Sequence, residues 1–137
     1  VTSVYISIDI KENVTDVTTK LKLRRNREAV SNTSLWLDGQ DIELTRLIID
    51  SVDMPLGDDM LGHLSLGDQG LSVAGLGDEA VIEVQSRCYP QHNTALEGLY
   101  LSGGMYCTQC EAPPVDLSPP CLRLRLLASP ARCKCSA

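Results

Sequence analysis

The sequence predicts an all-β protein, an incomplete antiparallel β-sandwich followed by a disordered tail rich in proline and cysteine. Apolar and polar residues alternate over several short segments, with the period of two that is typical of half-buried strands. Glycine beside aspartate recurs between these segments, which is typical of turns. No segment shows a convincing amphipathic helix pattern. Because phenylalanine is absent and aromatic residues make up 4% of the chain, the core must consist of valine, isoleucine and leucine.

The first two strands are expected to form a hairpin. Over residues 4–11, four aliphatic side chains alternate with polar ones, so one face of this strand should be half-buried. A segment rich in valine and threonine follows at 14–23, after a short Glu12-Asn13 connection that suits an antiparallel turn. The four aliphatic residues are Val4, Ile6, Ile8 and Ile10.

Five further strands are predicted, each bounded by glycine, aspartate or both. Together with the hairpin they give about seven strands at short spacing, which favours an antiparallel sandwich or a half-barrel. The five segments are 35–37, 42–49, 64–66, 71–73 and 80–85.

The composition changes sharply between Ala112 and Pro113. The last 25 residues hold five of the seven prolines and three of the six cysteines, and they carry a net charge of +3 against −9 for residues 1–112. We therefore expect a partial β-sandwich domain at 1–112 and a non-homologous, disordered tail at 113–137. Pro119-Pro120 should prevent regular structure nearby, and the apolar run at 122–127 has no evident partner.

The charge balance excludes some partners. With 12 basic and 18 acidic residues the net charge is −6, which argues against a nucleic-acid binder. No apolar run approaches the roughly 20 residues of a membrane-spanning helix, so no membrane partner is expected. The chain opens Val1-Thr2-Ser3, without a signal peptide, and is expected to begin inside a larger protein. No protein partner is evident, and the compartment stays open.

No complete catalytic or metal-binding motif is present. His63 and His92 are far apart and lack the His-Glu-x-x-His spacing of a helical zinc site, and no Gly-x-Ser-x-Gly elbow occurs. Cys107 and Cys110 form a Cys-x-x-Cys that, with the three tail cysteines, could bind zinc, but the spacing fits no standard zinc ribbon. We therefore assign no catalytic, cofactor or metal residue within this chain.

The candidate binding residues are Gln109 and Glu111. If the chain is extended there, their side chains leave one face roughly 6.5–7 Å apart, with Cys110 on the other face. A carboxylate beside an amide oxygen offers two acceptors to a small cation such as a primary ammonium. The alternative is that both side chains simply end a strand.

Several stretches of this sequence resemble a known family. Residues 93–100 (Asn-Thr-Ala-Leu-Glu-Gly-Leu-Tyr), the pair Gly103-Gly104 and residues 107–112 (Cys-Thr-Gln-Cys-Glu-Ala) are similar to the N-terminal domain of zinc aminopeptidases of the aminopeptidase N family. The bacterial-type alanyl aminopeptidase branch, which also occurs in plastid-bearing eukaryotes, is the most similar. Residues 35–42 resemble a turn between strands of that branch.

The resemblance implies a saddle-like β domain from a peptidase that removes N-terminal residues from peptides. It implies that Gln109 and Glu111 hold the free α-amino group of the substrate, so the partner is a peptide N-terminus. It places zinc, the metal ligands and the catalytic tyrosine in a later domain, so this chain should be a truncated, inactive fragment. A cytoplasmic or plastid location is expected for the parent.

Two other functions stay open from the sequence. The chain could be a stand-alone β-sandwich binding or interaction module without peptidase activity, or a cysteine-coordinated metal or redox protein. Intact Gln109 and Glu111 favour the aminopeptidase fragment, because a module with another task needs no ammonium anchor.

Overall fold

The computed structural model describes residues 1–25, 34–39, 42–57, 64–67, 70–94, 96, 98–109 and 121–125. These residues form eleven strands and one short 3₁₀ helix, which confirms the all-β prediction. The elements are β1 (Ser3–Ile10), β2 (Thr15–Arg24), β3 (Ser34–Asp38), β4 (Glu43–Ile49), β5 (Val52–Met54), β6 (Leu64–Gly67), β7 (Gly70–Val73), β8 (Glu79–Cys88), η2 (Pro90–His92), β9 (Gly98–Ser102), β10 (Met105–Gln109) and β11 (Cys121–Arg125).

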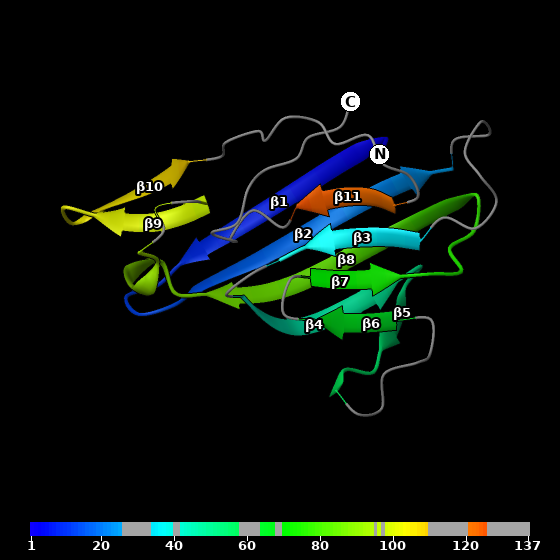
Figure 1. Ribbon diagram of the computed structural model, residues 1–137, viewed down its shortest axis with the longest axis horizontal. Helices are drawn as coiled ribbons and strands as arrows, with labels where there is room; N and C mark the ends of the chain where they lie inside the picture. The colour runs from blue at the N-terminus through cyan, green and yellow to red at the C-terminus, as the bar shows by residue number, and fades with distance from the viewer. Residues whose placement is uncertain are drawn as a thin grey trace.

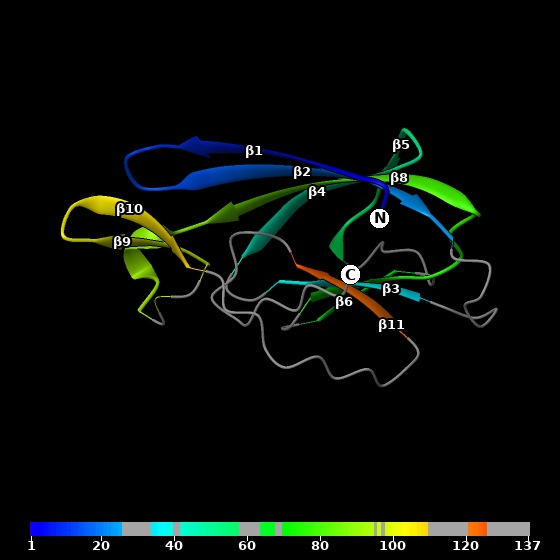
Figure 2. The same ribbon diagram turned by 90° about the horizontal axis from the view of Figure 1, so that it is seen from above.

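The strands form three sheets arranged in two layers. One layer is a five-stranded sheet in the order β1-β2-β8-β4-β5. A four-stranded sheet, β11-β3-β7-β6, and the separate β9–β10 hairpin both lie on the same side of it (Figures 1 and 2). The described residues contain no helix long and apolar enough to cross a membrane.

The predicted first hairpin is present, but the expected half-burial of its first strand is wrong. β1 pairs with β2 in continuous antiparallel register, and the Lys11 N–H donates to the Val14 carbonyl across the turn at 2.9 Å. Along β1 only Ile6 is partly buried, whereas Val4 is 51% exposed and Ile8 43%. The reason is position: β1 is the outer strand of its sheet, and of its inward-facing residues only Ile6 packs against either core cluster.

The main core lies where the four-stranded sheet faces the five-stranded one. Its buried members are the inward-facing aliphatic residues of both layers, as expected for a sandwich. Gly70 allows close approach there, because a Cβ at this position would lie 2.3 Å from the Leu37 carbonyl oxygen. The core residues are Leu21, Leu35, Leu37, Leu47, Ile49, Leu64, Leu71, Val73, Ile82 and Val84.

A second, smaller cluster lies under the β9–β10 hairpin. Val17, Cys88 and Leu99 are buried together there, with Ile6 and Ile42 packed against them. The inner face of the five-stranded sheet is therefore covered by two elements: the four-stranded sheet over one part and the β9–β10 hairpin over another.

Disorder was predicted throughout 113–137 and stays a prediction there, while residues 121–125 within this range form the strand β11. Its backbone pairs in parallel with β3, from Cys121 opposite Ser34 to Arg125 opposite Asp38. The physical reason is that β3 has one edge left open by β7, and 121–125 alternates apolar and basic residues with the period of a strand. Residues 113–120 and 126–137 lie outside the described residues, and so does the proposed boundary at 112/113.

Candidate substrate-anchoring site

Gln109 is the last residue of β10 and is exposed. It lies opposite Gly98 of β9, a residue without a side chain. The register places Gln109 on the same face as Cys107 and Tyr100, whereas Thr108 shares the other face with the buried Leu99. Gln109 therefore lies on the hairpin face away from the second cluster.

The β9–β10 hairpin has a tight turn. Gly103 and Gly104 connect the two strands with φ angles of 56° and 80°. Two successive positive φ angles are the signature of a type I′ turn, which glycine adopts without steric cost. The pair of glycines noted in the sequence thus fixes the register that brings Gln109 opposite Gly98.

Contacts from both sides hold this hairpin in place. Before it, the Asn93 side-chain amide donates to the Leu99 carbonyl at 2.9 Å, and the neighbouring Pro90 of η2 is buried. At its far strand, the Tyr106 hydroxyl donates to the Lys11 carbonyl at 3.4 Å. The Gln91 amide donates to the Asn13 carbonyl. The hairpin is therefore fixed against the β1–β2 turn.

Glu111 and Cys110 lie outside the described residues. The structure thus places Gln109 and leaves its predicted companion undescribed. The opposite faces predicted for Gln109 and Cys110 likewise stay a prediction.

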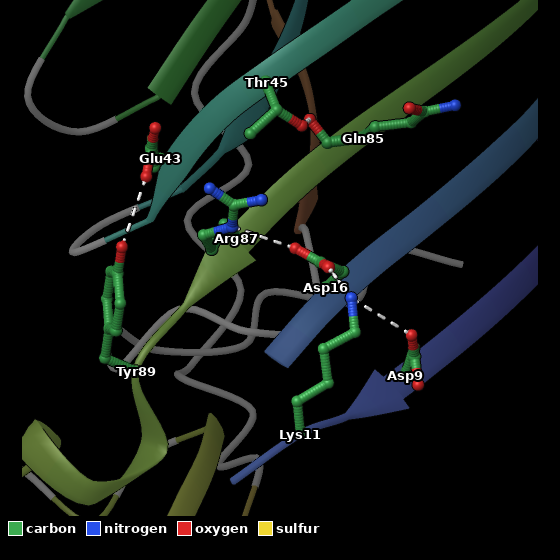
Figure 3. Close-up of polar contacts among 8 residues, drawn as sticks. All are labelled: Asp9, Lys11, Asp16, Glu43, Thr45, Gln85, Arg87 and Tyr89. Carbon is green, nitrogen blue, oxygen red and sulfur yellow. Dashed lines mark hydrogen bonds and ion pairs between the residues drawn. The ribbon is translucent and has the colours of Figure 1, made fainter. Parts of the chain in front are cut away.

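A network of ion pairs that sequence reasoning missed lies on the outer face of the five-stranded sheet, near the β1–β2 turn (Figure 3). Asp16 accepts from Lys11 Nζ at 2.5 Å and from Arg87 Nε at 3.0 Å, and Lys11 also lies 3.4 Å from Asp9. Those two hydrogen bonds, first that from Lys11, lower the pKa of Asp16. The same contact with Asp16 raises the pKa of Lys11.

This network joins three strands at the end of the sheet where the hairpin docks. Asp16 and Arg87 are 71 residues apart, so no local motif could reveal the pair. The alternation of each strand indicates that Asp16 and Arg87 lie on its outward face. Only the pairing of β2 with β8, which the sequence does not show, places them opposite each other. Next to it, the Tyr89 hydroxyl donates to the Glu43 carboxylate at 3.3 Å.

The cysteines give no metal site in the described part of the chain. Cys88 and Cys107 are both free thiols, and burial raises the pKa of Cys88 to about 11. No three His, Cys, Asp or Glu side chains come together among the described residues. Cys110, Cys133 and Cys135 of the alternative zinc hypothesis lie outside them.

Comparisons with known proteins point to one kind of enzyme. No family model matches the chain. It is 35% identical over 104 residues to aminopeptidase N of Caulobacter vibrioides, covering 76% of this chain and 11% of that protein. It is 30% identical over 112 residues to the Escherichia coli aminopeptidase N, covering 82% and 12%. The Haemophilus influenzae aminopeptidase N is 35% identical over 117 residues, covering 82% and 12%.

A solved structure agrees in fold. Aminopeptidase A of Legionella pneumophila, solved in complex with aspartic acid, matches 75% of this chain and 12% of its own, with a TM-score of 0.59 and 24% identity. The chain corresponds to an aminopeptidase N-terminal domain. This aminopeptidase domain spans about an eighth of the length of the curated relatives it matches. The predicted resemblance is confirmed at that level.

Proposed function

We propose that this domain anchors substrate in a zinc aminopeptidase, with Gln109 and Glu111 holding the free α-amino group of a peptide. The similarity to three bacterial aminopeptidases N supports the enzyme class. The observation that carries the residue assignment is the position of Gln109, exposed at the end of β10, opposite a glycine and on a hairpin fixed from both sides.

The chemistry suits an exopeptidase, which must distinguish a free terminal amine from an internal amide. A peptide α-amine has a pKa of about 7.7–8.0 and is mostly protonated near neutral pH. A carboxylate at 111 would bind it by a charge-assisted hydrogen bond of about 1.5–3 kcal/mol. The Gln109 amide oxygen would add a neutral hydrogen bond of about 1 kcal/mol. Binding the amine at a fixed point sets the register of the peptide.

The described residues do not fit zinc, because no three metal-ligating side chains lie together in them. In this proposal zinc belongs only to the parent enzyme. The 137-residue chain by itself is accordingly expected to show no turnover of aminoacyl amides, with or without added zinc, because a catalytic zinc needs about three protein ligands and an open position.

The test is kinetic and uses the complete aminopeptidase that contains this domain. Glu111→Ala should lower kcat/KM on an unblocked aminoacyl substrate by roughly 10- to 200-fold, the factor that corresponds to a charge-assisted hydrogen bond. Gln109→Ala should cost less, roughly fivefold, since it removes a neutral bond. Neither change should alter the zinc content of the enzyme.

The matched control is Thr108→Ala, next to Gln109 but on the opposite face of β10. It should leave kcat/KM unchanged, whereas a purely structural role for this strand end predicts similar small effects at all three positions. Equal kcat/KM for the wild type and Glu111→Ala would contradict the assignment.

A further inference from the structure

Among the described residues, no strand pairs with the outer edge of β1 in the five-stranded sheet. β1 is the outermost strand, it pairs with β2 without interruption over eight residues, and its inward-facing positions carry no charge. Natural edge strands are usually short, bulged, or protected by proline or an inward charge. β1 has none of these protections. We propose that β1 binds a second copy of this chain, with the two β1 strands antiparallel about a twofold axis at Ser7.

The backbone has the correct hydrogen-bond phase for this pairing. The Lys11 N–H donates to the Val14 carbonyl, so residues 11 and 14 form a hydrogen-bonded pair of the β1–β2 ladder. Because such pairs alternate along an antiparallel ladder, the odd residues of β1 bond to β2 and the even ones direct their N–H and C=O groups to the open edge. Antiparallel pairing centred on Ser7 joins even residues to even residues and would form about eight bonds between the copies.

The side chains on the inner face are self-complementary in that register. Val4 falls opposite Ile10 of the second copy, and Ile6 falls opposite Ile8. Val4, Ile8 and Ile10 are 51%, 43% and 43% exposed in one copy. Their β2 partners Leu21, Val17 and Thr15 are buried, so the apolar face would continue across the axis. Aliphatic cross-strand pairs of this kind stabilise sheets.

The outer face brings no like charges directly opposite one another. Tyr5 would face Asp9 of the second copy, Ser3 would face Lys11, and Ser7 would face Ser7 on the axis. Asp9 and Lys11 are already paired within each copy. The twofold arrangement also closes, because the opposite edge of this sheet is β5, with three residues and the Arg46–Asp53 ion pair at 2.6 Å. An open stack would need a longer partner edge there.

The experiment places charge on the axis. Sedimentation over a concentration series measures the mass of the full chain. As the concentration increases, this mass should rise from that of a monomer to that of a dimer, and the rise should occur before the concentration reaches about 100 μM, as for a weak interface. Ser7→Lys puts two lysines face to face and should weaken the dimer roughly fivefold or more. Ser7→Glu should do the same. A one-to-one mixture of the two variants should restore the dimer, because a lysine of one copy would then face a glutamate of the other.

The matched control is Thr18→Lys. Thr18 is the β2 partner of Ser7 and lies on the same face, so this variant adds the same charge at a distance from the axis and should leave dimerisation unchanged. Ile8→Pro should abolish the dimer while keeping the fold, since it removes only an edge-facing N–H.

Three results would overturn the proposal. They are a wild-type chain that stays monomeric throughout the series, equal dimerisation of wild type and Ser7→Lys, or a mixture of the lysine and glutamate variants that remains monomeric. The first does not depend on any variant, and circular dichroism of each variant alone confirms that it is folded before the second and third are scored.

Discussion

The two strands of the first hairpin have similar sequence patterns and opposite environments. β2 is buried at every second residue from Thr15 to Leu21, whereas β1, joined to it residue by residue, is exposed along almost its whole length. The alternation of β1 is the cleaner of the two, with isoleucine or valine at each inward position. A period of two thus shows which residues share a face. It does not show whether another layer covers that face.

The difference arises from what lies opposite each strand. β2 faces the four-stranded sheet at one end and the β9–β10 hairpin at the other, through Leu21 in the main core and Val17 in the second cluster. β1 lies one strand further out, and only Ile6 packs against either cluster. Main-chain bonds to β2 and contacts on the outer face therefore hold β1, with little help from burial.

The largest expected effect comes from making the same change on both strands. Val17→Ala on β2, 2% exposed, should lower the free energy of unfolding by about 2–3 kcal/mol, because it removes buried methyl groups and leaves a cavity. Val4→Ala on β1, 51% exposed, should cost less than about 1 kcal/mol. Chemical denaturation in a Ser7→Lys background measures both without a contribution from dimerisation. Equal losses would contradict the contrast between the strands.

The seven strands read from the sequence are present as β1, β2, β3, β4, β6, β7 and β8, because alternation and turn residues are local signals. β5 was missed for a local reason. The turn before it is formed by Asp50 and Ser51, with φ angles of 49° and 69°, and has no glycine to mark it. The Asp50 carboxylate accepts from the Val81 N–H at 2.7 Å, a partner 31 residues away. β9 was not among the predicted strands, although Gly103-Gly104 was the signal for its hairpin.

At the candidate site, too, local sequence features could be predicted, whereas contacts that depend on strand pairing could not. Gln109 was predicted as a binding residue from a motif contiguous in sequence; it lies at an exposed strand end, and its binding role stays a prediction. The network of Lys11, Asp16 and Arg87 was not found, because its members meet only after β1, β2 and β8 have paired. The parallel pairing of β11 was missed for a related reason, since an open sheet edge cannot be recognised before the sheet is assembled.

An effect of intermediate size is expected on the reactivity of Cys88 in the second cluster. This thiol is protected only if the β9–β10 hairpin covers it. Burial raises the pKa of this thiol to about 11 from an ordinary value of 9.0. At pH 8 the folded chain should therefore alkylate at Cys107 well before Cys88, by roughly tenfold or more in rate. Mass spectrometry after peptide digestion separates the two sites.

The same shift makes stability depend on alkaline pH. Between about 9 and 11 the folded state keeps the Cys88 proton and the unfolded state loses it, so the free energy of unfolding should fall as pH rises through this window. Cys88→Ala should remove that slope. Equal alkylation of both thiols in the folded chain would show that the β9–β10 hairpin does not close over the cluster.

The smallest expected effect concerns the outer face that helps to hold β1. Asp16→Asn removes the acceptor of Lys11 and Arg87 and leaves the inner face of β2 unchanged. Because these groups are largely exposed, the unfolding midpoint near pH 7 should fall only slightly. The more sensitive readout is amide exchange. Exchange should become faster in β1 than in β8, because of these two strands only β1 lacks a buried face.

The pKa of Asp16 is lowered in the folded state, so its contribution to stability is present above the ordinary value of 3.8 and is lost as pH falls through the folded value. The difference in stability between wild type and Asp16→Asn should therefore vanish in acid.

Asp53→Asn serves as the control, because it breaks the comparable pair with Arg46 at the other edge of the sheet and should leave exchange in β1 unchanged. If both variants changed β1 equally, the network at Asp16 would have no specific part in holding the strand.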